Sequence, residues 1–407
     1  MEEILELYEI QFADLMALLS DQNPLSNEEI QRLELISRSI MQNLGRSGPG
    51  LLSISGAPEA RTSQTLLPLA RKLALLKNDD RKRILKDHNL GSDVPLKNLD
   101  RIVSSFAMQM KYDDEFGFKF EGSEMVGDGE FKDLGFAFRE LGFCMMELGL
   151  CLARVCDKQI GGCELEQSLL QCGTAKGRLI HYHSVADNVA IKEAANQKRG
   201  SRGSNVNLRE NRRFDVDDND DGGGDGSSKL WQQWHYDYGV FTVLTTPIFM
   251  LSNGSDEQEC GSPSGHTYLQ VFHPETNSVV MVRASRGSFI VQVGESADVL
   301  SRGRLRATLH SVGRPAKMEN LSRETFVVFL QPAWSRTFSL ADYPVEVEPS
   351  CNEETGGARR ELNGLTRKIL EIVPPLSSRL RDGMTFAEFS KETTKQYYGG
   401  RGLQPNR

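Results

Sequence analysis

Two residues with metal-binding side chains, His235 and Asp237, lie two positions apart in the run Trp-His-Tyr-Asp-Tyr-Gly, just before a predicted strand. Because residues two apart on an extended segment point to the same side, the imidazole and the carboxylate can bind one ion. His310 lies in a second strand-like run and can supply a third ligand. Two histidines and one carboxylate form the facial triad that binds non-haem Fe(II) and leaves coordination positions open. The sequence therefore predicts a metal site made of His235, Asp237 and His310.

A pair suited to binding a carboxylate follows on the next predicted strand. Arg323 and Thr325 are two residues apart, so their side chains share a face. A guanidinium binds a carboxylate through two parallel hydrogen bonds, and a hydroxyl adds another donor. This pair therefore suits the far carboxylate of a dicarboxylic acid, although a basic residue on a strand more often faces solvent.

The elements that must position these residues change in type along the chain. Apolar residues at three- and four-residue spacing predict helices over 28–44, 66–76 and 132–160, with one strand at 51–55. From Trp231 onward the sequence predicts short strands separated by Gly, Pro and Asn turns. The strands are expected at 240–246, 268–273, 278–283, 288–293, 305–312 and 325–330. Evenly spaced short strands predict a sandwich or barrel, of which a jelly roll is one form.

Composition and charge exclude several classes of partner. The chain has 407 residues and a formal net charge of −8, which argues against nucleic acid and against a membrane surface. The most apolar stretch, 134–156, carries four charges at helical spacing, which predicts an amphipathic helix and no membrane span. The N-terminal run lacks a basic region and a cleavage site, so no signal peptide is expected. Seven cysteines without a C-x-x-C pair predict mostly free thiols in a reducing compartment.

The second half of the chain resembles the 2-oxoglutarate/Fe(II)-dependent dioxygenase family, in its plant-type, isopenicillin-N-synthase-like branch. The family's H-x-D is matched by His235 and Asp237. The run Ser-Arg-Gly-Arg-Leu-Arg-Ala-Thr-Leu-His, which ends at His310, is similar to the family's S-N-G-x-x-x-S-x-x-H segment. Arg323-Glu-Thr325 stands where the family has R-x-S, and the hydroxyl is kept. The resemblance is specific over about residues 231–334.

One family motif is altered. The run Arg-Leu-Ile-His-Tyr-His-Ser, which begins at Arg178, stands where family members carry R-x-N-x-Y, whose Tyr binds 2-oxoglutarate. Ile180 occupies the Asn position, and the Tyr position falls on Tyr182 or, with a shift of one residue, on His183. We take Tyr182 as the expected contact and keep His181 and His183 as further pocket candidates.

The resemblance implies a function and a set of cofactors. Fe(II) would be bound by His235, Asp237 and His310, and 2-oxoglutarate, the cosubstrate, by Arg323, Thr325 and Tyr182. The expected reaction uses O₂ and couples oxidative decarboxylation of 2-oxoglutarate to hydroxylation or desaturation of a small-molecule substrate. No nucleic acid or membrane is expected as a partner, and protein partners are not predicted. The plant branch also suggests a cytoplasmic location, with the nucleus as a second one.

The resemblance also implies a mixed α and β fold with a double-stranded β-helix (jelly-roll) core and N-terminal and C-terminal helices. A polar segment, nearly without apolar residues, interrupts the chain before the first ligand and predicts a flexible insert. The expected regions are a mainly helical support region at 1–195, the insert at 196–228, the dioxygenase core at 229–344 and a C-terminal loop with helices at 345–407.

Two alternatives stay open. A His/Asp/His site can also hold Zn²⁺ and activate water, which would make the chain a hydrolase. Against this, the sequence has no H-E-x-x-H motif, and Arg323 has no clear role in hydrolysis. The other alternative is a non-enzymatic jelly-roll binding module that retains the metal site, which the altered R-x-N-x-Y run and the long insert favour. The complete ligand set and Arg323 favour the enzyme.

Overall fold

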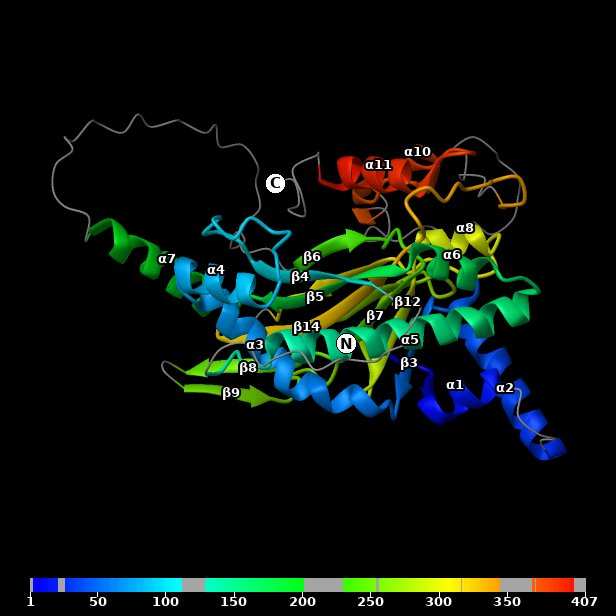
Figure 1. The fold of residues 1–407 in the computed structure, drawn as a ribbon, viewed down its shortest axis with the longest axis horizontal. Coiled ribbons are helices and arrows are strands. Elements are labelled where there is room, and N and C mark those ends of the chain that lie inside the picture. The colour runs from blue at the N-terminus through cyan, green and yellow to red at the C-terminus, as the bar shows by residue number, and fades with distance from the viewer. Residues whose placement is uncertain are drawn as a thin grey trace.

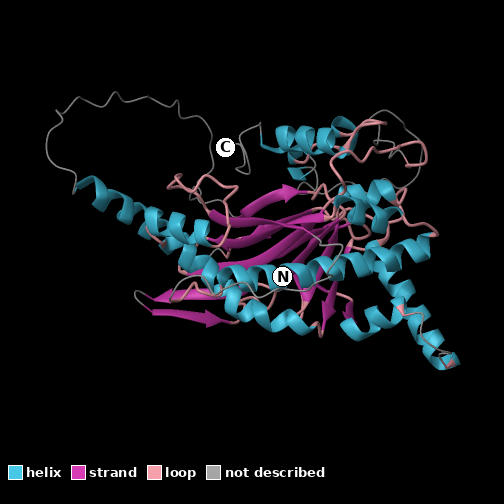
Figure 2. Cartoon of the chain, viewed as in Figure 1, coloured by secondary structure: helices cyan, strands magenta, loops and turns pink. Residues whose placement is uncertain are grey.

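The computed structural model describes residues 3–20, 26–111, 129–200, 230–253, 256–315, 317–344, 368–369 and 371–398. Within them the fold is mixed α and β, with two facing β-sheets and helices packed against the larger sheet (Figures 1 and 2). Of the regions expected from the sequence, residues 201–228 of the insert and 345–367 of the C-terminal loop lie outside the described residues.

The larger sheet combines strands from both halves of the chain. Its order is β2 (Glu9–Gln11), β3 (Leu51–Ser55), β12 (Phe289–Val293), β7 (Phe241–Thr245), β14 (Leu321–Leu330), β5 (Thr174–Tyr182) and β4 (Val103–Lys111). Strand β8 (Ile248–Asn253) also pairs with β14, and β9 (Asp256–Cys260) pairs with β8.

The smaller sheet carries the two histidines predicted to bind metal. Its order is β1 (Glu3–Glu6), β11 (Ser278–Arg283), β10 (Leu269–His273), β13 (His310–Gly313) and β6 (Leu230–His235). A cluster of buried side chains from both sheets lies between them and includes Trp231, Val271, Leu244 and Val327.

The described helices lie around the two sheets, and several of them pack on the larger one. They are α1 (Phe12–Leu19), α2 (Asn27–Leu44), a short 3₁₀ helix (Pro58–Arg61), α3 (Thr62–Leu75), α4 (Asn78–Asp87), α5 (Leu134–Ile160), α6 (Glu164–Cys172), α7 (Val185–Gly200), α8 (Glu295–Leu300), α10 (Leu376–Arg379) and α11 (Phe386–Tyr398). Helices α3 and α5 run along one face of the larger sheet and share its main apolar core (Figure 1).

Strand β14 shows how the sequence separates core from site. Its side chains alternate between two faces, as in any strand. Phe326, Val328 and Leu330 face the helices and belong to the main apolar core. The intervening residues, which include Arg323 and Thr325, face the space between the sheets. Because side chains on a strand alternate with a period of two, the Arg323 guanidinium and the Thr325 hydroxyl face the same interior space.

Helix α5 packs closely against the larger sheet because glycines lie at two contact points. A Cβ on Gly142 would collide with the Met110 side chain, and a Cβ on Gly149 would collide with the Leu330 side chain. The helix ends at Gly161, whose φ of 86° forms the left-handed cap that glycine favours. The glycines and large apolar residues of α5 thus allow this helix to pack closely on the pleated surface of the larger sheet.

Several elements follow the sequence prediction closely. The expected helices at 28–44, 66–76 and 132–160 correspond to α2, α3 and α5, and the expected strand at 51–55 is β3. Strands β7, β10, β11, β12 and β14 lie where the second half predicted them. Strands β10 and β11, at two of these predicted positions, form an antiparallel pair.

Other elements differ from the prediction. The strand expected at 305–312 begins only at His310, because Leu305 forms a single bridge to Gly45 and the Thr308 hydroxyl donates to the Gly50 carbonyl. Strands β4 and β5 were not predicted, yet they complete one edge of the larger sheet. Helix α7 runs to Gly200, so residues 196–200 of the expected insert belong to it.

No helix in the described part of the chain combines the length and the apolar character that a bilayer crossing demands.

Candidate metal centre

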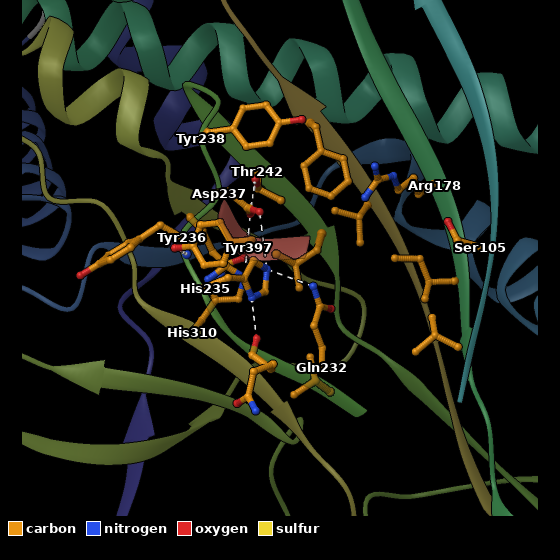
Figure 3. A pocket seen from close by; sticks show the side chains of 18 of the residues that line it. Ser105, Arg178, Gln232, His235, Tyr236, Asp237, Tyr238, Thr242, His310 and Tyr397 are labelled. Atoms are coloured by element: carbon orange, nitrogen blue, oxygen red, sulfur yellow. Dashed lines mark hydrogen bonds and ion pairs between the residues drawn. The ribbon is translucent and has the colours of Figure 1, made fainter. Parts of the chain in front are cut away.

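Strand pairing brings the two predicted histidine ligands together. His235 ends β6 and His310 begins β13, and these residues are direct partners in the antiparallel ladder. Asp237 follows two residues later. Its carboxylate oxygens lie 3.8 Å from His235 Nε2 and 3.9 Å from His310 Nε2. One ligand atom from each residue lies within 4.8 Å of the others. Figure 3 shows the three side chains gathered at one place.

Backbone carbonyls fix the orientation of both imidazoles. His235 Nδ1 lies 2.8 Å from the Gln233 carbonyl, and His310 Nδ1 lies 3.0 Å from the Thr308 carbonyl. Because a carbonyl only accepts hydrogen bonds, each Nδ1 carries the proton and each Nε2 keeps its lone pair. The two Nε2 atoms and the Asp237 carboxylate are therefore a ready set of donors, which fits a divalent transition metal such as Fe(II).

Burial supports this protonation state. His235 and His310 are 7% and 6% exposed. Burial, followed by the neighbouring His310, lowers the pKa of His235 to about 4, although the Asp237 charge opposes the shift. The His235 imidazole is therefore neutral at pH 7, as metal binding requires.

The turn that presents Asp237 is held by the start of α8. The Glu295 amide donates to the Asp237 carbonyl at 2.8 Å, and the Ser296 amide donates to the Gly239 carbonyl at 3.0 Å. A Cβ on Gly294 would collide with the Gly239 backbone. On the side-chain level, the Thr242 hydroxyl donates to Asp237 Oδ2 at 2.6 Å. Both backbone and carboxylate are thus held in place.

A cavity of about 400 Å³ extends from the metal ligands between the two sheets. It is lined by all six residues predicted for the site, namely Tyr182, His235, Asp237, His310, Arg323 and Thr325. The C-terminal helix α11 contributes Tyr397 to the wall. Its hydroxyl accepts from the Tyr236 amide at 3.2 Å, so this helix also contacts the backbone between the two ligands of the H-x-D motif.

The predicted carboxylate-binding pair lies deep in this cavity. Arg323 and Thr325 are each 1% exposed. Arg323 Nε donates to the Thr267 carbonyl at 3.0 Å, and the Thr325 hydroxyl donates to the Thr245 carbonyl at 3.2 Å. Burial lowers the pKa of Arg323, which marks a desolvated cation that gains from an anionic partner.

Tyr182 occupies the position beside this arginine. It is the cross-strand partner of Arg323, whose guanidinium carbon lies 5.0 Å from the centre of the Tyr182 ring. The Tyr182 hydroxyl donates to Gln232 Oε1 at 2.9 Å, and Gln232 Nε2 lies 3.0 Å from His235 Nε2. Gln232 thus links the predicted cosubstrate contact to a metal ligand.

The other two pocket candidates were wrong, because β5 alternates. His181 and His183 point to the opposite face from Tyr182 and are not among the residues that line the cavity. His181 Nδ1 lies 2.8 Å from Glu324 Oε1, and His183 Nε2 lies 2.8 Å from Ser104 Oγ. Both are buried in a polar network behind the sheet.

The sequence did not single out Gln232 and Gln292, two of the polar residues that line the cavity, and it indicated Arg178 only as the first residue of the altered R-x-N-x-Y run. Gln292 is 2% exposed, and its Nε2 has no hydrogen-bond partner among the described residues. It pairs across the ladder with Thr242, the residue that contacts Asp237. The place of Arg178 in the cavity could have been inferred from the sequence. If residues 174–182 are taken as a strand, Arg178, Ile180 and Tyr182 are two residues apart and share one face.

Comparison with solved structures finds proteins of similar fold. A full-length Neurospora crassa protein, solved in complex with alpha-KG and 5-formyluracil, matches with a TM-score of 0.50 at 14% identity, over 89% of this chain and 94% of that one. JOX2 in complex with 2OG, Fe and JA matches with a TM-score of 0.51 at 13% identity, over 99% of this chain and 91% of that one. At these identities the likeness shows a shared fold. No protein-family model and no curated protein matches the sequence.

Proposed function

We propose that this chain is an Fe(II)- and 2-oxoglutarate-dependent oxygenase whose facing sheets form a double-stranded β-helix core. One observation carries the proposal: the His/Asp/His triad opens onto a cavity that also contains a buried arginine. Among the described residues, Arg323 has no carboxylate partner. A buried, unpaired cation is costly, so the site gains when an anion binds there. A dicarboxylate that reaches from the metal to Arg323 would bind the metal at one end and place an anion beside the buried arginine at the other.

The chain's own residues have distinct tasks in this reaction. Arg323 and Thr325 bind the far carboxylate of 2-oxoglutarate, and Tyr182 packs beside the guanidinium. The Gln233 and Thr308 carbonyls hold the imidazoles with their lone pairs toward the metal. When bound, Fe(II) supplies the redox chemistry by which O₂ oxidises 2-oxoglutarate to succinate and CO₂ and the substrate is hydroxylated or desaturated.

The proposed substrate is a small molecule. The Neurospora crassa and JOX2 structures hold 5-formyluracil and JA, respectively, together with the cosubstrate. A cavity of about 400 Å³ that is covered by α11 is of a size suited to small ligands. The H-x-D…H…R-x-Thr pattern supports placement in the plant-type, isopenicillin-N-synthase-like branch.

The test is release of CO₂ from 2-oxoglutarate labelled at its first carbon, measured in air with Fe(II) and ascorbate. We expect slow release by the wild-type protein even without the prime substrate, and loss of release in His310→Ala and Arg323→Gln. Replacement of Fe(II) by Zn²⁺ should abolish it. Equal release by the wild type and both variants, or release supported by Zn²⁺, would contradict the proposed reaction.

A further inference from the structure

A second cationic group lies in the same cavity, apart from the triad and from Arg323. Lys176 and Arg178 are on β5 and share the cavity face with Tyr182. In Figure 3, Arg178 and Ser105 lie on the side of the cavity away from His235, Asp237 and His310. The proposed function assigns neither cation a role.

The charges at this place do not cancel. One carboxylate, Asp93, meets both cations: its Oδ2 lies 2.7 Å from Lys176 Nζ and 2.8 Å from Arg178 Nε. Burial would raise the pKa of Asp93, but the Arg178 charge and the hydrogen bond from Lys176 outweigh it and hold the pKa below its ordinary value. Asp93 is therefore ionised at neutral pH. In the described part of the chain, two cations pair with this one anion, which leaves an excess of one positive charge.

The Arg178 guanidinium is held ready for a ligand. Its side chain is 18% exposed, and its central carbon lies 4.6 Å from the centre of the Phe329 ring. Asp93 engages Nε, and neither Nη group has a hydrogen-bond partner among the described residues. A stacked, partly desolvated guanidinium with both Nη groups available presents the planar fork that binds a carboxylate through two hydrogen bonds.

This cation is distinct from the proposed cosubstrate anchor. In the ladder between β5 and β14, Arg323 pairs with Tyr182 and Val327 pairs with Arg178. At about 3.3 Å per residue, the four-residue step along β5 places the Cα atoms of Tyr182 and Arg178 about 13 Å apart. When the far carboxylate of 2-oxoglutarate is bound at Arg323, Arg178 therefore remains available to bind another molecule. Apolar side chains line the cavity here and suit the body of that molecule: Ile180 lies between Tyr182 and Arg178 on β5, and Val327 is the cross-strand partner of Arg178.

We propose that Arg178, supported by Lys176, binds the carboxylate of the oxidised substrate, so that the substrate class is a small monoanionic organic acid with an apolar body. This assignment rests on the proposed function. The single excess charge matches one carboxylate, and the position across the cavity from the triad directs the far, apolar part of the acid toward the metal.

The experiment is calorimetric titration with three carboxylates, phenylacetate, 4-phenylbutyrate and octanoate, each compared with its neutral primary amide. The protein is titrated anaerobically, both loaded with Fe(II) and 2-oxoglutarate and free of both. The variants are Arg178→Gln, Arg178→Lys and a matched control, Arg286→Gln, which removes an exposed arginine that pairs with Glu259. The visible band of the loaded sample reports cosubstrate binding separately, so failure of the proposed function is seen independently.

We expect at least one carboxylate to bind the wild type more tightly than its amide. Arg178→Gln should weaken the binding of that carboxylate by roughly tenfold or more, because a charge-assisted hydrogen bond is lost. The affinity for the amide should not fall. Arg178→Lys should retain part of the preference, and Arg286→Gln all of it. Equal binding of acids and amides by the wild type would overturn the proposal, as would an equal loss of both in Arg178→Gln.

Discussion

At the scale of single residues, the candidate centre depends on hydrogen bonds that fix its ligands before a metal arrives. Each histidine donates to the carbonyl two residues before it, and Asp237 accepts from Thr242. Such outer partners commonly change metal affinity by about 10–100-fold when they are removed.

Thr242→Val tests this role, since it keeps the shape of the side chain and removes the hydroxyl. We expect Fe(II) affinity to fall roughly tenfold because the Asp237 carboxylate loses its orienting donor. Equilibrium dialysis under anaerobic conditions with metal analysis measures the change. Thr65→Val, at an exposed position on α3, is the matched control. Unchanged affinity in Thr242→Val would show that the Asp237 carboxylate does not need this hydrogen bond.

The sequence predicted those residues whose partners are close in the chain. His235 and Asp237, like Arg323 and Thr325, share a face because they are two apart on extended backbone. Gln232 and Gln292 could not be predicted in the same way. Their place in the cavity depends on which strands are neighbours, and that neighbourhood is set by pairing between distant segments.

At the scale of elements, β5 separates two environments. One face lines the cavity with Arg178 and Tyr182, and the other carries His181 into a buried polar network. In that network Asp187 of α7 pairs with Arg71 of α3 at 2.7 Å and lies 3.4 Å from His181 Nε2. The network therefore ties two helices to the back of the strand that carries the proposed ligand contacts.

This strand was missed because its sequence, Thr-Ala-Lys-Gly-Arg-Leu-Ile-His-Tyr, has polar and charged residues on the face that later lines a cavity. A half-buried strand normally alternates apolar and polar residues, and the apolar side faces the core. Here both faces are enclosed, and polar residues such as His181 and Lys176 pair with residues of other elements. The alternation of apolar and polar residues that indicates a strand is therefore weak in β5. By contrast, the three- and four-residue spacing of apolar residues that indicates a helix is clear in α5.

Asp187→Asn tests the buried network. Burial would raise the pKa of Asp187, but the hydrogen bond and charge of His181, together with the Arg71 charge, outweigh it and hold the pKa below 3.8. A lowered carboxyl pKa contributes stability that is complete above about pH 4 and is lost as the pH falls further. At pH 7 we expect the variant to lose about 2–3 kcal/mol, because the buried Arg71 loses its charged partner on α7 and keeps only its ion pair with Glu257.

Urea denaturation at pH 7 and at several values below pH 4 measures both effects. The difference between the wild type and Asp187→Asn should shrink as the pH falls below about 4, as the wild-type carboxyl takes up its proton. Asp14→Asn, which removes an exposed partner of Arg32, should change little. A constant difference at all pH values would mean that the Asp187 charge is not what stabilises the network.

At the scale of the whole molecule, the site is assembled from both halves of the chain. The first half supplies Tyr182 on β5 of the larger sheet. The second half supplies the histidines on the smaller sheet, Arg323 and Thr325 on the larger sheet, and α11, which contributes Tyr397 to the cavity wall. A buried ion pair between Arg379 of α10 and Glu295 of α8 connects the C-terminal helices to the turn that holds Asp237. The C-terminal helices that cover the cavity and the turn that presents Asp237 are therefore both held by α8.

The sequence predicted a mixed α and β fold because the change from helical to strand periodicity is strong. It did not predict that β1 to β5 of the first half join both sheets, since pairing between distant segments leaves no local pattern. For the same reason, the motif residues of the cavity were predicted, whereas the other residues that line it were not.

The most direct test of the central claim is anaerobic titration of the Fe(II)-loaded protein with 2-oxoglutarate, followed by the visible charge-transfer band of the chelate. It needs no knowledge of the substrate. We expect a saturable band in the wild type, a large rise in the 2-oxoglutarate concentration needed to saturate it in Arg323→Gln, and neither bound iron nor a band in His310→Ala. Bound iron without a band at any 2-oxoglutarate concentration would contradict the account.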